Sequence, residues 1–293
     1  HGMIFDDGVT SRLDENHYHM TTTTGGAARV MSWLEEFLQT EWLDMQVFCT
    51  SVTEQWSVLS ISGPNARNFL SELTDIDLSK ESFPFMRFRE GKVCGIDARV
   101  FRISFTGELA FEINVPARYG SYVWNEFMTH GKNYNITAYG TEAMHVLRAE
   151  KGFIIVGQDT DGSVTPFDLN MEWIVSKKKE DFLGKRSFSR SDTSRNDRKK
   201  LVGLLVNDKT TVLPEGSHIV EKSKSQPPMK MLGHVSSSYF SPTNGHPIAL
   251  ALLKNGASRM GDEVEIPLMN GKVIKATVTD PIFYDKEGLR NNE

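Results

Sequence analysis

The chain has 293 residues, of which 39% are hydrophobic, 10% aromatic and 24% charged, a composition that excludes a disordered or fibrous protein. At about 150 residues per domain, this length predicts roughly two domains, or three small ones. A formal net charge of −5 argues against nucleic-acid binding, and two cysteines are too few for a secreted disulfide framework. The longest apolar run, residues 247–253, is far shorter than the roughly 20 residues of a membrane helix.

The beginning of the chain, His1-Gly2-Met3, lacks both the basic segment and the apolar stretch of a signal peptide. It does not resemble a natural initiation site either, so we expect the chain to be a piece of a longer protein. With no targeting segment and no membrane helix legible in the sequence, we expect a cytoplasmic location.

The first zone of the chain, residues 1–74, mixes strand and helix patterns. The Thr-rich residues 19–24 favour a strand, and residues 46–61 indicate two short strands. Gly63-Pro64 predicts the start of a second helix, with Pro at its first position. Between them, one apolar stripe at helical spacing predicts an amphipathic helix; its members are Val30, Trp33, Leu34, Phe37 and Leu38.

The second zone, residues 75–190, alternates strands and helices in the same way. Residues 93–104 indicate a strand, and residues 109–115 alternate between apolar and polar side chains, which indicates a second strand joined to the first through the corner at residues 105–108. A helix is expected after Pro116, with Tyr119, Tyr122, Val123 and Phe127 facing inward, and another from Thr141 to Lys151. The alternation predicts layered α/β units.

The composition changes at residues 177–200, which hold ten Lys and Arg against four Asp and Glu. This segment is interpreted either as a solvated basic linker or as a contact for phosphate or a partner. The third zone, residues 201–293, is rich in strand patterns, and Asn270-Gly271 predicts a hairpin turn between two alternating segments. We therefore expect a small β-sandwich or β-barrel there.

Motif searches first exclude several kinds of site. No G-x-G-x-x-G, Walker loop or G-x-S-x-G motif occurs, so no flavin, nicotinamide, nucleotide or serine-hydrolase site is legible in this chain. His17 and His19 are placed to share one face of a strand, but no cysteine pair or carboxylate cluster joins them. A polar strand face is therefore the favoured interpretation, and no metal site is predicted.

Three charged residues remain as candidates for chemistry. Asp6, which precedes Asp7-Gly8, belongs either to a hairpin turn or to a site where its carboxylate lies beside a cationic intermediate. In the second case, two opposite charges ~4 Å apart attract each other by about 4 kcal/mol at an effective dielectric of ~20. Glu112 lies on the polar face of its strand, either in solvent or accepting two adjacent N–H donors such as a pterin edge presents. Arg148, with Glu142 and Glu150 nearby, favours a surface salt bridge.

Six segments, in this order, resemble the aminomethyltransferase (glycine-cleavage T-protein) family, and they span nearly the whole chain. They are residues 2–8 (GMIFDDG), 61–66 (ISGPNA), 105–112 (FTGELAFE), 147–152 (LRAEKG), 156–159 (VGQD) and 240–245 (FSPTNG). Finer features resemble one branch of that family, the C-terminal folate domains of heterotetrameric sarcosine oxidase α subunits. They are residues 20–25 (MTTTTG), 147–166 and 280–285 (DPIFYD).

The resemblance implies an α+β fold, with layered α/β domains plus a C-terminal β-barrel in a cloverleaf around a folate cavity. The implied parts are residues 1–74, an N-terminally incomplete folate-binding part, then 75–190 and the barrel 201–293, with the basic linker at 177–200.

By motif, Asp6 matches the family's catalytic aspartate and Glu112 the carboxylate that grips the pterin. Phe105 matches a pocket aromatic that is often Tyr, and lacks its hydroxyl. Arg148 matches the arginine of the L-R-L-E-A-G segment, and Thr23 falls where an Asn commonly contacts folate.

The implied activity is the transfer of a one-carbon unit to tetrahydrofolate, which forms 5,10-methylenetetrahydrofolate from the imine or formaldehyde product of sarcosine oxidation. Flavin and NAD are then expected elsewhere in the full complex, and the expected partners are the other oxidase subunits and the upstream part of the same subunit. Met144-His145 departs from the Arg-Asp common in T-proteins. A free-standing aminomethyltransferase or folate-dependent demethylase, and a non-enzymatic folate-binding module, remain open.

Overall fold

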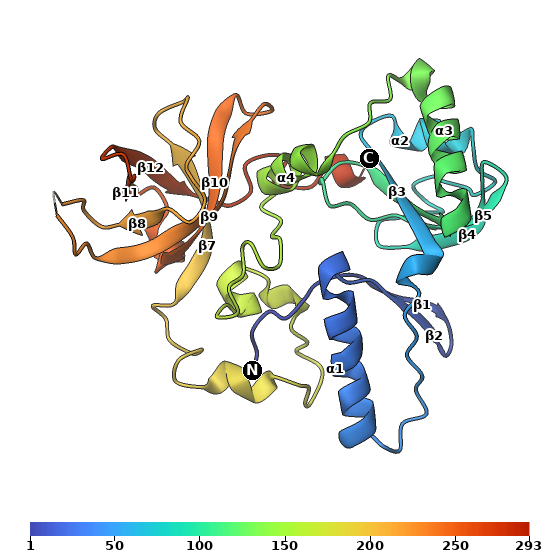
Figure 1. Cartoon of the computed structure of the whole chain (residues 1–293), viewed down its shortest axis with the longest axis horizontal. Coiled ribbons are helices and arrows are strands. Elements are labelled where there is room, and N and C mark those ends of the chain that lie inside the picture. The colour runs from blue at the N-terminus through green and yellow to red at the C-terminus, as the bar shows by residue number, and fades with distance from the viewer. Residues whose placement is uncertain (225, 293) are drawn as a thin grey trace. The chain divides into compact units, whose positions relative to one another are not determined.

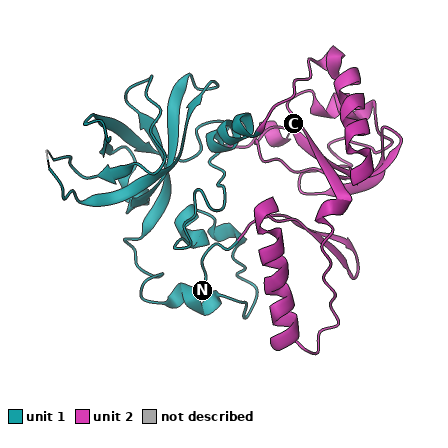
Figure 2. Ribbon diagram, in the orientation of Figure 1, with its two compact units in different colours: residues 1–5, 141–286 teal, residues 6–140, 287–293 magenta. Residues whose placement is uncertain are grey.

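The computed structural model describes residues 1–224 and 226–292, which form two compact units. Unit 1 comprises residues 1–5 and 141–286, and unit 2 comprises residues 6–140 and 287–293 (Figure 2). Within the described residues, no helix is both long and apolar enough to cross a membrane.

Unit 2 is built on a four-stranded antiparallel sheet in the order β3-β6-β5-β4 (Figure 1). Its strands are β3 (Trp56–Ser62), β4 (Phe88–Val93), β5 (Ile96–Phe101) and β6 (Ala110–Pro116). Helices α2 (Ala66–Ser71) and α3 (Gly120–His130) pack on one face of this sheet. The alternation of β6 places apolar side chains on that face, so the core forms there; it includes Phe69, Leu70, Phe111, Ile113, Val115, Val123 and Phe127.

The remainder of unit 2 starts with the hairpin of β1 (Thr10–Asp14) and β2 (His17–Met20), followed by α1 (Ala27–Thr40). The predicted amphipathic helix is confirmed by α1. The strand predicted at residues 19–24 is wrong beyond Met20. Thr21 instead exchanges hydrogen bonds with the backbone of Val9, and the backbone N–H of Thr23 donates to the Asp6 carboxylate. Of the two strands predicted within residues 46–61, only β3 forms.

Two further predictions in unit 2 need correction. The single strand expected at residues 93–104 is interrupted, because Cys94 and Gly95 adopt φ values of 51° and 77°. These left-handed conformations form the turn of the β4–β5 hairpin. The helix predicted after Pro116 is α3, in which Val123 and Phe127 are buried as expected, but Tyr122 is 46% exposed.

Unit 1 combines helix α4 (Thr141–Glu150) with a closed barrel in the strand order β10-β7-β12-β11-β8-β9 (Figure 1). The barrel confirms the predicted α+β class with a C-terminal β-barrel. Gly271, at φ 82°, forms the predicted turn between the last two strands. The strands are β7 (Lys199–Val206), β8 (His218–Val220), β9 (Met231–Ser241), β10 (His246–Lys254), β11 (Glu263–Pro267) and β12 (Val273–Thr279).

Short 3₁₀ helices connect these elements throughout the chain. They are η1 (Thr24–Gly26), η2 (Thr53–Gln55), η3 (Ala117–Tyr119), η4 (Gly131–Tyr134), η5 (Pro166–Leu169), η6 (Glu172–Ile174), η7 (Lys185–Ser189), η8 (Gly256–Arg259) and η9 (Arg290–Asn292). The division into three parts at residues 74, 190 and 201 stays a prediction, as does the arrangement of the parts around a cavity.

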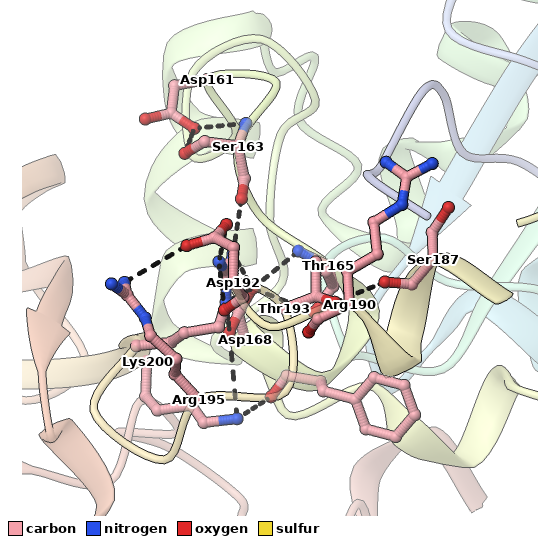
Figure 3. Close-up of polar contacts among 12 residues, drawn as sticks. Asp161, Ser163, Thr165, Asp168, Ser187, Arg190, Asp192, Thr193, Arg195 and Lys200 are labelled. Carbon is pink, nitrogen blue, oxygen red and sulfur yellow. Dashed lines mark hydrogen bonds and ion pairs between the residues drawn. The ribbon is translucent and has the colours of Figure 1, made fainter. Parts of the chain in front are cut away.

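Residues 177–200 are largely irregular, but the end of this segment is anchored inside unit 1. Arg198 donates from Nη2 to Asp168 at 2.7 Å and from Nη1 to Asp192 at 2.9 Å. Asp168 is 1% exposed and also accepts from the backbone N–H and hydroxyl of Thr165. Burial by itself would raise the pKa of Asp168, but the hydrogen bonds from Arg198 and Thr165 lower it. Figure 3 shows Asp168 with Thr165 and Asp192 near it. The hydrogen bonds to Asp168 and Asp192 give Arg198 a structural role.

Candidate functional site

The Asp6 carboxylate is held in one orientation by its neighbours in unit 2. Its side chain is 6% exposed, and its Oδ1 accepts hydrogen bonds from the backbone N–H groups of Asp7 and Thr23, both at 2.9 Å. Its Oδ2 accepts from the Thr23 hydroxyl at 3.0 Å and lies 3.6 Å from Nη2 of Arg29. A carboxylate offers about four acceptor positions, so Asp6 is fixed while retaining capacity for a further donor.

Two glycines allow this arrangement. A Cβ on Gly26 would lie 1.8 Å from Asp6 Oδ2 and 2.6 Å from the Thr23 hydroxyl oxygen, and a Cβ on Gly8 would lie 2.0 Å from the carbonyl oxygen of Thr21. All three distances are far below van der Waals contact, so a larger residue at Gly26 would displace the side chains of Asp6 and Thr23, and one at Gly8 would displace the backbone at Thr21. Residues 6–8 therefore do not form the hairpin turn that was the alternative interpretation, since β1 begins only at Thr10.

Glu112 lies on β6, on the face of the sheet that α2 and α3 leave uncovered. Burial raises the pKa of its carboxyl group, and no charge or hydrogen bond opposes that effect. Among the described residues, its carboxylate has no hydrogen-bond or ion-pair partner. It is thus a half-buried acid whose acceptor positions are available to a ligand.

The β1–β2 hairpin connects the surroundings of Asp6 to those of Glu112. His19 on β2 stacks on Phe101 at a centroid distance of 5.8 Å and an interplanar angle of 26°, and Phe101 is the register neighbour of Glu112. Burial, with help from Arg99 and His17, lowers the pKa of His19, which favours a neutral ring against Phe101. The strand that leads to Thr23 therefore covers part of the sheet face that carries Glu112.

Phe105 lies half-buried in the connection between β5 and β6. Four of the five predicted site residues, namely Asp6, Thr23, Phe105 and Glu112, thus belong to unit 2. The structure joins Asp6 to Thr23 directly, and their roles toward folate stay predictions.

Arg148 belongs to unit 1 and is completely buried, so the surface salt bridge expected for it is wrong. Its Nη1 donates to Asp159 Oδ2 at 2.6 Å and to the Phe153 carbonyl at 3.0 Å, and its Nη2 donates to the hydroxyls of Ser237 at 2.7 Å and Tyr239 at 3.2 Å. These contacts tie α4 to β9. A direct contact between Arg148 and folate rests on the family resemblance and stays a prediction.

Sequence reasoning missed two residues on the Glu112 face. The hydroxyl oxygen of Ser62 is buried without a hydrogen-bond partner among the described residues. Asn114 follows Glu112 at the next position on the same face of β6 and is only 5% exposed. Asparagine is depleted in strands, so its occurrence two residues after a candidate binding carboxylate was a signal available in the sequence.

The chain is similar to known proteins over nearly its whole length. It matches the family description "GCVT N-terminal domain" over residues 1–179 and "Glycine cleavage T-protein C-terminal barrel domain" over residues 199–285. The sarcosine oxidase subunit alpha of Corynebacterium sp. (strain P-1) is 52% identical over 99% of this chain and 30% of that protein. The corresponding subunit of Rhizobium meliloti (strain 1021) is 40% identical, with the same coverage of both chains.

Aminomethyltransferases match over a larger share of their own length. The enzyme of Listeria monocytogenes serotype 4a (strain HCC23) is 30% identical over 97% of this chain and 74% of that protein. The crystal structure of an aminomethyltransferase T from Bartonella henselae superimposes with a TM-score of 0.80 at 23% identity, covering 97% of this chain and 73% of the other. The latter likeness shows the fold. The chain spans about 30% of the length of the sarcosine oxidase subunits that it matches.

Proposed function

Because the chain belongs to the glycine cleavage T-protein family, we propose that it binds tetrahydrofolate and transfers one-carbon units to it. We propose further that it does so as a domain of a sarcosine oxidase α-type subunit. The identity of 52% over 99% of the chain to such a subunit, against 30% to the aminomethyltransferase of Listeria, supports this second step.

The observation that carries the proposal is the Glu112 carboxylate. The pyrimidine edge of a pterin presents two adjacent N–H donors, at N3 and the 2-amino group, which a carboxylate accepts in bidentate fashion. Glu112 is half-buried, has a raised pKa and has no partner among the described residues. A half-buried carboxylate without partners is partly desolvated, which costs free energy, and a bound pterin would supply hydrogen bonds in place of the lost water.

Asp6 is proposed as the catalytic residue. Its carboxylate is fixed by Thr23 and by the close approach of Gly26, so it needs no reorganisation to face a positive charge. Such a carboxylate stabilises a cationic one-carbon donor and accepts a proton as the donor is consumed. Preorganised placement of this kind is how a protein accelerates a transfer between two bound partners.

Bound tetrahydrofolate would supply the N5 and N10 nitrogens that accept the one-carbon unit as 5,10-methylenetetrahydrofolate, while their two hydrogens leave with the displaced amine or as water. The donor is proposed to be the imine or formaldehyde from sarcosine oxidation, with the flavin and NAD held elsewhere in the complex. The partners are then the other subunits and the remainder of the α-type subunit. Phe105 and Arg148 are kept as folate-binding residues on the resemblance alone.

A free-standing aminomethyltransferase is the second candidate, because the Listeria enzyme matches 97% of this chain over 74% of its own length. Both candidates require the same folate site. They differ in the source of the one-carbon unit, so supplying sarcosine with its oxidase subunits, or an aminomethyl carrier, separates them by product formation.

The test of the folate site is an anaerobic calorimetric titration of tetrahydrofolate into the full chain and into Glu112→Gln. Loss of a charge-assisted bidentate contact is expected to weaken binding about 10- to 100-fold. Glu54→Gln, at an exposed position before β3, is the matched control and should bind as wild type does. Absence of binding to wild type, or equal binding to Glu112→Gln, would overturn the proposal.

A further inference from the structure

The uncovered face of the unit 2 sheet carries three polar side chains whose hydrogen-bonding groups are not used within the protein. In the antiparallel register, Ser60 lies opposite Glu112, and Ser62 lies opposite Ala110. Ala110, Glu112 and Asn114 share one face of β6 because side chains alternate along a strand, and directly opposed residues on neighbouring strands lie on the same face. Ser62, Glu112 and Asn114 therefore all lie on the side of the sheet away from α2 and α3. They are a hydroxyl, a carboxylate and an amide on two neighbouring strands.

Asn114 is the most enclosed of the three, with 5% of its surface exposed. Its opposite neighbours in register are Val58 on β3 and Arg99 on β5. Val58 offers no hydrogen-bonding side chain. Arg99 is engaged by Glu90, through Nε at 3.0 Å and Nη2 at 2.9 Å, and lies over the Trp56 ring at 5.2 Å. The Asn114 amide makes no hydrogen bond to another described residue.

The Asn114 amide is not fully enclosed, since neither of its atoms is among the buried atoms without a partner. With 5% of the residue exposed, however, it has little contact with water, so its hydrogen-bonding capacity is largely unused in the protein. A polar group retained under that condition beside a second unpartnered polar group indicates a ligand that binds both. The buried Ser62 hydroxyl oxygen, also without a partner among the described residues, extends the same pattern along the sheet.

We propose that Asn114 is a second pterin-binding residue, which donates its side-chain N–H to the 4-oxo oxygen of the ring that Glu112 holds. This inference rests on the proposed function. The edge of a 2-amino-4-oxo pteridine runs from the 2-amino group through N3–H to O4, that is, two donors followed by one acceptor. Glu112 is acceptor-only when ionised, so O4 needs a separate donor, and an amide supplies one.

The donor role makes a specificity prediction. An amide can rotate to present either its N–H or its oxygen, whereas a carboxylate at the same position presents acceptors only. Asn114→Asp should therefore disfavour a 4-oxo pterin and accept a 4-amino pterin. A merely structural role for Asn114 would weaken both ligands equally and leave their ratio unchanged.

The experiment compares tetrahydrofolate with tetrahydroaminopterin, its 4-amino analogue, by anaerobic calorimetry on the full chain. In Asn114→Asp, the ratio of the tetrahydrofolate Kd to the tetrahydroaminopterin Kd should rise at least about tenfold over wild type. Asn125→Asp introduces the same charge at an exposed position on α3 and should leave the ratio at the wild-type value. Asn114→Ser, in case the aspartate variant does not fold, should weaken tetrahydrofolate about fivefold to tenfold.

The outcomes distinguish a failure of the Asn114 role from a failure of the proposed folate site. If wild type binds neither compound, or Glu112→Gln binds as tightly as wild type, the folate site fails and the role of Asn114 fails with it. If Glu112→Gln loses binding while the folded Asn114 variants keep both the affinity and the ratio of wild type, the folate site stands and Asn114 has no part in recognition. A raised ratio in Asn114→Asp, or tetrahydrofolate binding that weakens more than tetrahydroaminopterin binding in Asn114→Ser, supports the inference, whereas equal weakening of both ligands in a folded variant overturns it.

Discussion

Two charged side chains, one in each unit, differ in how many partners the protein supplies to them. In unit 1, Arg148 donates four hydrogen bonds, to Asp159, Ser237, Tyr239 and a backbone carbonyl. In unit 2, Glu112 and the hydroxyl oxygen of Ser62 have no such partner among the described residues. Where a protein completes its own hydrogen bonds, the group stabilises the fold; where it does not, the group is available to bind.

The largest loss of stability is expected from removing a hydrogen-bond partner of Arg148. Asp159→Ala leaves the Arg148 guanidinium buried without its counter-charge, so the free energy of unfolding of unit 1 should fall by about 3–5 kcal/mol. Chemical denaturation followed by circular dichroism measures this. Arg148→Met combined with Asp159→Leu should recover much of the loss. A change below about 1 kcal/mol in Asp159→Ala would show that the pair is not a structural contact.

An intermediate effect is expected from Gly26→Ala, which targets the fixed carboxylate. The added Cβ would lie 1.8 Å from Asp6 Oδ2, so Asp6 must move, and a displacement of about 1 Å can cost about 100-fold in rate. The enzyme-dependent rate of 5,10-methylenetetrahydrofolate formation should fall by that order, while tetrahydrofolate affinity changes less. Gly25→Ala is the matched control, because its Cβ meets nothing within 4 Å. Equal rates in the two variants would contradict a positioned Asp6.

The smallest effect is expected on the pH dependence of stability, through the unpaired carboxyl group of Glu112. The pKa of Glu112 is raised by burial above its ordinary value near 4.5, so below that pH both states are protonated and the group costs nothing. As pH rises through the folded-state pKa, ionisation is harder in the folded chain, and stability is lost.

Glu112→Gln removes that cost. The free chain of this variant should therefore be more stable than wild type at pH 7, with a gain that vanishes toward pH 4. Thermal unfolding at both values measures this, and Glu54→Gln should change stability by less than about 0.5 kcal/mol. A destabilised Glu112→Gln at pH 7 would mean that its carboxylate has partners in the protein.

Elements with strong local periodicity were predictable from sequence. The stripe of α1 and the alternation of β6 each repeat over several residues, so the helix, the strand and the polar placement of Glu112 are confirmed. Elements that depend on distant partners or unusual backbone were not. Strand β9 was missed because Ser236, Ser237 and Ser238 interrupt its apolar pattern, and the β4–β5 turn was missed because Cys94 is a non-glycine residue at positive φ.

The site shows the same division. Asp6 and Thr23 are 17 residues apart and Arg148 and Ser237 are 89 apart, so no local pattern reveals either contact. The residue patterns left Asp6 and Glu112 with two interpretations each, and the family resemblance favoured the functional one and added Thr23. It gave no sign that Arg148 is fully buried, because burial of a charge depends on partners that only the folded chain assembles.

The most direct test of the account is a crystal structure of the chain with 5-formyltetrahydrofolate. The account predicts the pteridine ring on the uncovered face of the β3-β6-β5-β4 sheet, with its N3 and 2-amino group within hydrogen-bonding distance of Glu112 and with Asp6 against the same ligand. A ligand bound elsewhere, with the Glu112 carboxylate still unpaired, would contradict it.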